Sequence, residues 1–213
     1  MIDNPIIIFG ARSLGKVALE ILQKNQLIVY GFLEDDDVLH ATEIDHVPVM
    51  GSTEDAAYLK LIGKKCEAFV AVENIDERRE IVKMLEEKRK VTPLNAIHPS
   101  AMLAQSAIIG HGNLLNTGVT LGAGAVLGSH CILHTHTIIE HDVVIHDFVQ
   151  VGAGSILNEA VKVEKNAFIG AGVTLVAGIT IGEGARVGAG AVVLADVKKG
   201  EAVLGNPAKL VKL

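Results

Sequence analysis

The chain of 213 residues carries 19 lysines and arginines against 25 aspartates and glutamates, a formal net charge of −6. This balance gives no electrostatic basis for binding nucleic acid or anionic lipid, so we expect neither a nucleic acid nor a membrane as a partner. No apolar run reaches the roughly 18 residues of a membrane-spanning helix, and no secretory leader pattern opens the sequence. The two cysteines, Cys66 and Cys131, are far apart in apolar surroundings, which is typical of reduced core residues. We therefore expect a cytoplasmic protein.

Residues 1–94 alternate short apolar runs with amphipathic segments. The expected buried strands are Pro5–Gly10, Leu27–Leu33 and Cys66–Val72, and the expected helices are Leu14–Asn25, a segment after Pro48–Ser52 that starts near Thr53, and Asp76–Lys90. Such alternation is typical of a small parallel sheet that is covered by helices. We therefore predict a Rossmann-like α/β domain over residues 1–94.

Ligands of such sheets bind beyond the carboxyl ends of the strands. The three expected ends are Gly10–Ser13, the acidic cluster Glu34–Asp37, and Val72–Asn74. Gly10 and Gly15 enclose four residues and lack the close-approach glycines of a dinucleotide fingerprint. An acidic strand end is most often only solvated, so the residues alone leave open whether this edge binds a phosphate or a ribose.

A period of six residues dominates the rest of the chain. Every sixth residue is aliphatic at positions 97, 103, 109, 115, 121, 127, 133, 139, 145, 151, 157, 163, 169, 175, 181, 187 and 193. The residue two places earlier is mostly small, and the residue one place later is often glycine, as at Gly110, Gly122 and Gly152. This period is neither that of a helix nor that of a plain strand, and it indicates a hexapeptide β-helix.

Three hexads make one triangular coil of about 18 residues, so each inward aliphatic residue stacks on its counterpart in the next coil. We expect glycine to provide the backbone torsions that the corners need. An antiparallel sandwich is the alternative, but a sandwich does not need one register over so many hexads. The predicted domain spans residues 95–213. Its solenoid is expected to end near Leu194, because Lys199 breaks the ladder, and the tail Glu201–Leu213 is expected to pack along the outside.

Five of the nine histidines lie within 17 residues of the predicted solenoid. They are His130, His134, His136, His141 and His146, and none occupies an inward aliphatic position, so we expect them on corners or outer faces. His141 differs from the others because Glu140 and Asp142 flank it. A nearby carboxylate can raise the basicity of an imidazole and fix its tautomer, as a general base requires. His141 is therefore the candidate catalytic base.

Both parts of the chain contain motifs that resemble one family. These are Gly10-Ala11 with Gly15-Lys16-Val17, Phe32-Leu33-Glu34-Asp35, Ile97-His98-Pro99-Ser100-Ala101, Ile139-Glu140-His141-Asp142 and Gly205-Asn206-Pro207-Ala208-Lys209. In these motifs the chain resembles the sialic acid O-acetyltransferase-type sugar acyltransferases, which include nucleotide-linked amino-sugar N-acetyltransferases. The resemblance implies a left-handed β-helix, a homotrimer, and acetyl-CoA bound in the groove between subunits.

The resemblance also implies roles for individual residues. His141 matches the family's general base, and Asp142 matches the carboxylate that increases the basicity of that base. Gln150, Ala171 and Ala189 match the acetyl-CoA contacts. The residues that match the substrate-binding segments of the first domain are Arg12, Ser13, Leu14, Glu34, Asp35 and Glu73.

The chain departs from the family pattern at several of these places. Ser13-Leu14 stands where the family has Gly-His, and Glu73 replaces a glycine that lets the nucleotide approach. Gln150, His134 and Glu159 replace a histidine, an asparagine and a corner glycine, respectively. The base is thus kept, while the pocket for a nucleotide sugar is altered.

These features predict an enzyme that transfers an acetyl group from acetyl-CoA to an amine or hydroxyl of a sugar or nucleotide-linked sugar, without a metal. One alternative is a metal enzyme like the gamma-class carbonic anhydrases. His141 and His146 have the spacing of that family's histidine pair, but Gln105 stands where a third ligand is expected. The other alternative is a non-catalytic trimeric scaffold.

The homotrimer has a second basis in the sequence. We expect apolar residues at outward positions of the coils, at Val119, Val126, Val144 and Val149. An apolar outer face favours contact between copies of the chain.

Overall fold

The computed structural model describes residues 4–212, so the first three residues of the predicted first domain and the last of the second lie outside it. The chain divides into two compact units, of which the first ends at Pro99 and the second begins at Ser100. Each unit is described by itself. Within the described residues, no helix combines the length and the apolar character that crossing a membrane requires.

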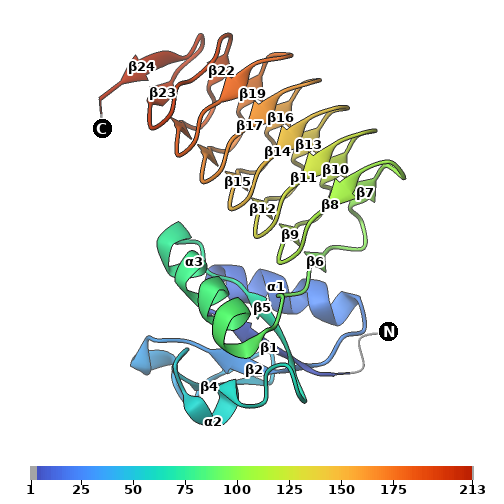
Figure 1. Ribbon diagram of the computed structural model, residues 1–213, viewed down its shortest axis with the longest axis vertical. Coiled ribbons are helices and arrows are strands. Elements are labelled where there is room, and N and C mark those ends of the chain that lie inside the picture. Colours follow the sequence, from blue (N-terminus) through green and yellow to red (C-terminus); the bar gives the residue numbers. More distant parts are fainter. Residues whose placement is uncertain (1–3, 213) are drawn as a thin grey trace. The chain divides into compact units, whose positions relative to one another are not determined.

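The first unit is built on one five-stranded sheet with the strand order β3-β4-β2-β1-β5 (Figure 1). All neighbours in this sheet are parallel except β3 and β4. The strands of this unit are β1 (Ile6–Phe9), β2 (Val29–Leu33), β3 (Glu43–Ile44), β4 (Val47–Gly51), β5 (Glu67–Val70) and β6 (Ala96–Ile97). The helices are α1 (Ser13–Lys24), η1 (Asp37–Leu39), α2 (Ala56–Leu59), α3 (Ile75–Met84) and the wider turn η2 (Leu85–Arg89).

The core of the sheet follows the predicted apolar runs. All four residues of β1 are fully buried, as are Phe32 and Leu33 of β2. Burial also raises the pKa of the Cys66 thiol, with a further rise from the charge of Glu67. That cysteine is a reduced core residue, as expected.

The structure departs from the sequence-based expectation at two places in this unit. The start of the second apolar run is not buried, because Ile28 is 72% exposed and Tyr30 is 46% exposed. Val47–Gly51 forms a strand that pairs with β2, and the helix expected from Thr53 is the four-residue α2. Alternating burial along β4 is compatible with Pro48, because that residue lies on the exposed side of the strand.

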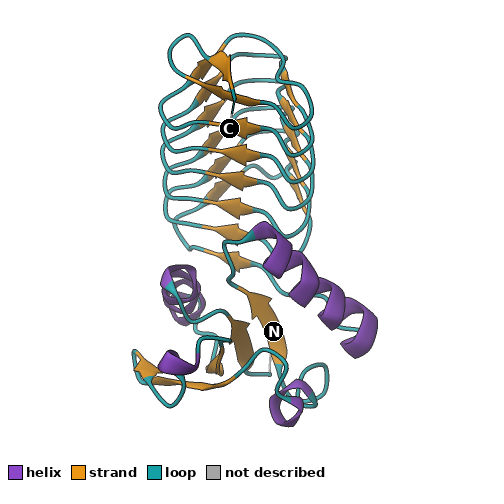
Figure 2. Ribbon diagram, turned by 90° about the vertical axis from the view of Figure 1, so that its left-hand side faces the viewer, coloured by secondary structure: helices purple, strands orange, loops and turns teal. Residues whose placement is uncertain are grey.

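The second unit is a left-handed parallel β-helix, as predicted (Figure 2). Strands one coil apart pair in parallel with an offset of 18 residues, for example Leu121 with Ile139 and Leu127 with Ile145. The two-residue strands are β7 (Met102–Leu103), β8 (Ile108–Ile109), β9 (Leu114–Leu115), β10 (Thr120–Leu121), β11 (Val126–Leu127), β12 (Ile132–Leu133), β13 (Ile138–Ile139), β14 (Val144–Ile145), β15 (Gln150–Val151), β16 (Ile156–Leu157), β17 (Lys162–Val163), β18 (Phe168–Ile169), β19 (Thr174–Leu175), β20 (Thr180–Ile181), β21 (Arg186–Val187) and β22 (Val192–Val193).

The aliphatic ladder forms the core of the solenoid. Its members from Leu115 to Val193 are all at most 2% exposed. Only the first coil is open, since Leu103 is 38% exposed. Burial of each such side chain stabilises the fold by about 1.5–3 kcal/mol relative to exposure. The six-residue period thus acts through coil-to-coil stacking, as the sequence indicated.

The glycines that follow the ladder residues do not provide corner torsions, contrary to the prediction. The left-handed corner conformation falls two residues later, at positions such as Gly112 and Gly172. A Cβ at Gly122 would lie 2.7 Å from the backbone of Glu140, and a Cβ at Gly152 would lie 2.4 Å from the nitrogen of Ala171. These glycines are therefore needed where the backbone of the next coil passes close by.

The end of the solenoid also differs from the prediction. Val197 still bridges to Ile181, and the tail residues Ala202–Leu204 form β23, which pairs in parallel with β21. Strand β24 (Lys209–Val211) then returns antiparallel to β23. The stacking therefore continues beyond Leu194, and this part of the tail extends a sheet.

Two of the four valines assigned to the outer face are in fact internal. Val119 and Val149 are fully buried, because they stand two places before Leu121 and Val151, at the second inward position. Val126 and Val144 are partly exposed. The apolar outer face is thus smaller than the sequence suggested.

Candidate active site

His141 lies on a corner of the solenoid, in the turn between β13 and β14. Its side chain is 56% exposed, so a substrate can reach the imidazole. The Oε2 of Glu140 lies 3.8 Å from Nδ1 of His141. The other ring nitrogen, Nε2, is then the one that can accept a proton from a substrate.

The side chain of Asp142 does not point toward the imidazole in the way that the side chain of Glu140 does. Its backbone is left-handed, with φ of 58°, and its carboxylate lies over Gly124 of the preceding coil, where a Cβ would be 2.6 Å from Oδ1. Within residues 4–212, no hydrogen bond or ion pair joins Asp142 to His141. The carboxylate beside the imidazole is therefore that of Glu140.

Further along the same corner lies Glu159, one coil after His141. The pairing of Ile139 with Leu157 sets this register, and the amide of Ala160 donates a hydrogen bond of 3.1 Å to the carbonyl of His141. Glu159 is exposed. The corner thus carries an accessible imidazole with acidic residues before it, after it and one coil beyond.

The remaining histidines have other surroundings. His130 is only 4% exposed, contrary to the expected outward position, and its ring stacks on Phe148 with centroids 4.9 Å apart. Nε2 of His134 is 3.0 Å from the side-chain amide nitrogen, Nε2, of Gln150. His146 lies 3.7 Å from a carboxylate oxygen of Glu164. In the part of the chain that the structure describes, His141 and His146 belong to no group of three potential metal ligands.

The residues matched to acetyl-CoA lie away from His141 in one chain. Gln150 opens strand β15, and Ala171 and Ala189 are exposed residues of another corner, one coil apart. The glycines beside that corner, Gly152 and Gly170, have no room for a Cβ against the nitrogens of Ala171 and Ala189. The structure therefore places His141 and these small corner residues on two different corners of the triangle.

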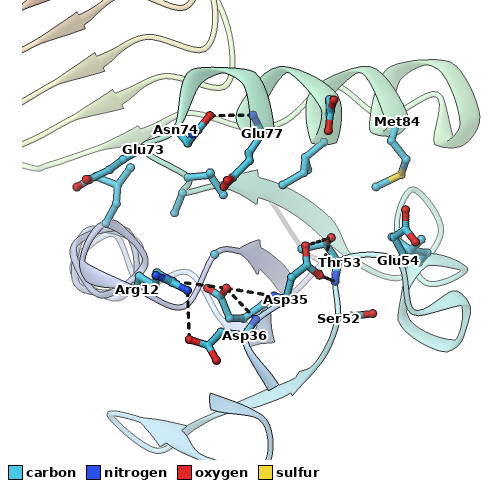
Figure 3. A pocket seen from close by; sticks show the side chains of 18 of the residues that line it. Arg12, Asp35, Asp36, Ser52, Thr53, Glu54, Glu73, Asn74, Glu77 and Met84 are labelled. Atoms are coloured by element: carbon cyan, nitrogen blue, oxygen red, sulfur yellow. Dashed lines mark hydrogen bonds and ion pairs between the residues drawn. The ribbon is translucent and has the colours of Figure 1, made fainter. Parts of the chain in front are cut away.

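The first unit contains a pocket of about 1230 Å³ at the carboxyl ends of its strands. Figure 3 shows Glu73, Asn74 and Glu77 on one side of it and Arg12, Asp35, Asp36 and Thr53 on the other. Because β1 is flanked by β2 and β5, this edge is where the chain switches sides of the sheet, the usual place for a ligand. All six residues matched to substrate-binding segments line the pocket, namely Arg12, Ser13, Leu14, Glu34, Asp35 and Glu73.

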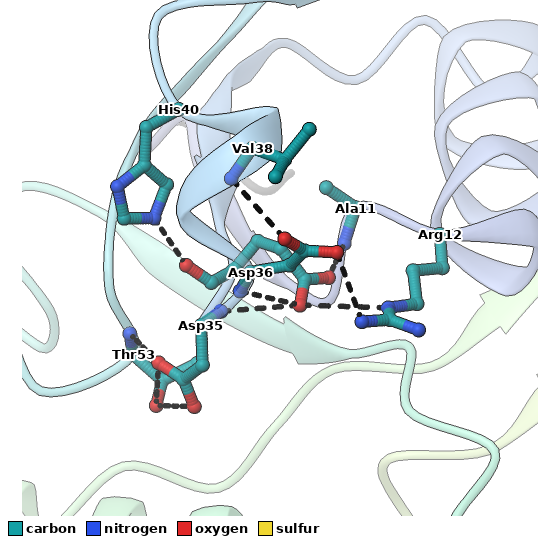
Figure 4. A network of polar contacts seen from close by, with 8 residues as sticks. Ala11, Arg12, Asp35, Asp36, Val38, His40 and Thr53 are labelled. Carbon is teal, nitrogen blue, oxygen red and sulfur yellow. Dashed lines mark hydrogen bonds and ion pairs between the residues drawn. The ribbon is translucent and has the colours of Figure 1, made fainter.

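The carboxylate of Glu34 is turned toward the backbone at the strand ends. It is 8% exposed, and its carboxylate accepts hydrogen bonds from the amides of Ala11 at 2.9 Å, Asp35 at 3.1 Å and Asp36 at 3.2 Å (Figure 4). Nε of Arg12 lies 3.7 Å from Glu34, and its Nη2 lies 3.1 Å from Asp36. Glu34 thus fixes the loop after β1 to the end of β2.

Sequence reasoning missed the contribution of β4 to this pocket. The carboxylate of Asp35 accepts hydrogen bonds from the amide of Thr53 at 2.8 Å and from its hydroxyl at 2.9 and 3.0 Å. Pro48 hid the strand that places Thr53 here. Arg78 of α3 was also missed; it is 1% exposed and donates to the carbonyls of Val72 at 2.7 Å and Glu73 at 3.0 Å. It thereby holds the end of β5 in position.

Both units match known families. Residues 5–85 match the PglD N-terminal domain, and residues 160–195 match the bacterial transferase hexapeptide repeat. No curated protein sequence gives a significant match.

Solved structures that are similar to nearly the whole chain include the following three, each 29% identical to it. A mutant of the perosamine N-acetyltransferase of Caulobacter crescentus, solved with CoA and GDP-perosamine, has a TM-score of 0.91, with 99% of this chain and 98% of that chain covered. The acetyltransferase domain of PglB from Neisseria gonorrhoeae, solved with acetyl coenzyme A, has a TM-score of 0.89, with 98% and 99% covered. WeeI from Acinetobacter baumannii has a TM-score of 0.87, with 97% and 99% covered.

Proposed function

We propose that the chain transfers the acetyl group of acetyl-CoA to the amine of a nucleotide-linked amino sugar. The reason is that it belongs to the hexapeptide-repeat sugar acyltransferases with a PglD-type N-terminal domain. The observation that carries this proposal is the likeness to acetyltransferases over 98% or more of the chain. It includes the pocket of the first unit as well as the solenoid, so the acceptor site and the acyl-transfer site both have a place.

His141 is the proposed general base. It takes a proton from the acceptor amine at Nε2 while the nitrogen attacks the thioester carbonyl, so that a C–N bond forms and the C–S bond breaks. The proton then passes to the sulfur of the leaving CoA. Glu140, 3.8 Å from Nδ1, favours the tautomer with a proton on that atom and stabilises the imidazolium after transfer. A backbone N–H group at a corner would stabilise the oxyanion.

The cosubstrate site is proposed to lie between two copies of the chain in a homotrimer. His141 occupies one corner of the coil, whereas Ala171 and Ala189 occupy another, so one chain does not bring them together. A neighbouring copy that packs beside the solenoid can place its own corner against the first. The partly exposed Val126 and Val144 offer apolar contacts for such packing.

The acceptor's nucleotide is proposed to bind in the pocket of the first unit. Asp35 and Thr53 are rigidly held at its wall, and Arg12 is fixed by two carboxylates. Glu73, exposed at the end of β5, makes the pocket more acidic where it replaces the family's glycine. We therefore expect the contacts to the diphosphate to differ from those of a pocket with a glycine there.

The test is a mass-spectrometric screen in which the protein is mixed with acetyl-CoA and a panel of amino sugars, both free and linked to GDP or UDP. The proposal predicts an acetylated product from at least one nucleotide-linked amino sugar and none from the matching sugar without its amine. Binding of acetyl-CoA with no transfer to any member of a broad panel would contradict it. Transfer to the free sugars alone would show that the pocket does not hold a nucleotide.

A further inference from the structure

An outward column of side chains runs along the solenoid face that contains Gln150. Gln150 pairs with Phe168 one coil later, and Phe168 pairs with Arg186 one coil after that. At roughly 4.8 Å per strand, the column spans about 10 Å along the axis. From this face the chain turns into the corner that carries the two alanines. Ala171 follows Phe168 by three residues, and Ala189 follows Arg186 by three residues.

The guanidinium group of Arg186 lies over the ring of Phe168, with 4.7 Å between its Cζ atom and the ring centroid. This cation–π contact holds the arginine at an exposed place, although Phe168 itself is only partly exposed. A guanidinium that contacts a ring through its flat face keeps the N–H groups at its edge available for hydrogen bonds. Those groups form the fork that binds phosphate oxygens in pairs.

Arg186 is chemically distinct within the second unit. It is the only arginine after Arg89 in the sequence. Within residues 4–212, no carboxylate forms an ion pair with it, whereas Lys165 pairs with Asp147 at 3.4 Å and Lys199 with Glu183 at 2.7 Å. A chain with a net charge of −6 needs local positive charge wherever a polyanion binds. Arg186 is an unneutralised, oriented cation on the face of the proposed cosubstrate contacts.

We infer that Arg186, held on Phe168, binds a phosphate group of CoA and so fixes the direction in which the cosubstrate lies along the solenoid. The inference rests on the proposed acetyl-CoA function. It places the acetyl end toward the coil of Gln150 and the phosphate-bearing end toward the coil of Arg186. Neither Arg186 nor Phe168 takes part in proton transfer. Arg186 is a binding residue, and Phe168 is the residue that positions it.

The test compares acetyl-CoA with acetylpantetheine, which lacks every phosphate group. Arg186→Gln should raise the Kd and KM for acetyl-CoA by about ten- to hundredfold, as expected for loss of a hydrogen-bonded charge pair. It should leave kcat, and the KM for acetylpantetheine, unchanged. Arg186→Lys should recover part of the affinity, and Phe168→Leu should cost about two- to fivefold. Lys162→Ala is the control, since it removes an exposed cation from the neighbouring face.

The outcomes separate this inference from the function it rests on. Failure of the unaltered protein to bind acetyl-CoA would overturn both. Normal acetyl-CoA binding by the protein together with an unchanged Kd in Arg186→Gln would overturn the inference alone. Equal losses for acetyl-CoA and acetylpantetheine, or an equal loss in Lys162→Ala, would also overturn it, because the effect would then not come from a phosphate. Circular dichroism of each variant checks that the exposed substitutions leave the solenoid folded.

Discussion

Among single residues, Glu34 shows how a polar side chain at the pocket can hold the backbone around it. Three backbone amides donate to its nearly buried carboxylate. Glu34→Gln should lower the free energy of unfolding by about 1–3 kcal/mol, since a neutral amide accepts these hydrogen bonds less well and presents its own donors to them. Urea denaturation measures the change. Glu54→Gln, at an exposed position of the same pocket, should change the stability by less than about 0.5 kcal/mol.

The sequence located the residues of the pocket better than it located their tasks. Arg12, Glu34 and Asp35 all line the cavity, because parallel strands end at one edge. Nothing in the sequence distinguishes a carboxylate that accepts backbone hydrogen bonds from one that faces a ligand. The same holds for His141, because both of its neighbours are acidic but only the carboxylate of Glu140 lies beside its ring, while that of Asp142 lies over Gly124.

At the scale of elements, the hexad was predictable because its ladder residues point inward without exception from Leu115 onward. The C-terminal end of the solenoid was not predictable, because Val197 and Val203 continue the stacking after the six-residue spacing is lost. Strand β4 was not predicted, because it is short and Pro48 interrupts its apolar residues. A periodic hydrophobic pattern therefore identifies an element only over the residues in which the pattern persists.

Two kinds of glycine occur in the solenoid, those at a close approach of the next coil and those with a left-handed backbone, and they lead to a prediction. Gly152→Ala should lower the free energy of unfolding by about 1–3 kcal/mol, because its Cβ would lie 2.4 Å from the nitrogen of Ala171. Gly172→Asn should cost less than that, because Gly172 has open space and Asn166 adopts the same left-handed conformation one hexad earlier. Thermal denaturation followed by circular dichroism gives both values. A larger loss in Gly172→Asn would show that torsion, not close approach, limits the corner.

For the whole molecule, the assignment of the base and the cosubstrate contacts to different corners makes assembly part of the proposed mechanism. We expect light scattering at micromolar concentration to give the mass of a trimer. Replacement of the partly exposed Val144 by Glu should weaken the assembly and lower the acetyltransferase activity in parallel, because a charged, hydrated carboxylate then replaces an apolar contact between copies. A fully active monomer would contradict the shared site. Val163→Ala, an internal change one coil away, provides the control for loss of stability without a change to the outer face.

The most direct measurement of the central claim is the single-turnover rate of acetyl transfer in His141→Ala, with the affinity for acetyl-CoA measured in parallel by calorimetry. A positioned base contributes about 10²–10⁴-fold to the rate, so the variant should be slower by that factor. Its affinity for acetyl-CoA should hardly change, because the imidazole meets the acceptor's proton and not the cosubstrate. Asp142→Asn and Glu140→Gln should each lower the rate by less. A His141→Ala variant as fast as the unaltered protein, or one slowed less than Asp142→Asn, would contradict the assignment of His141 as the base.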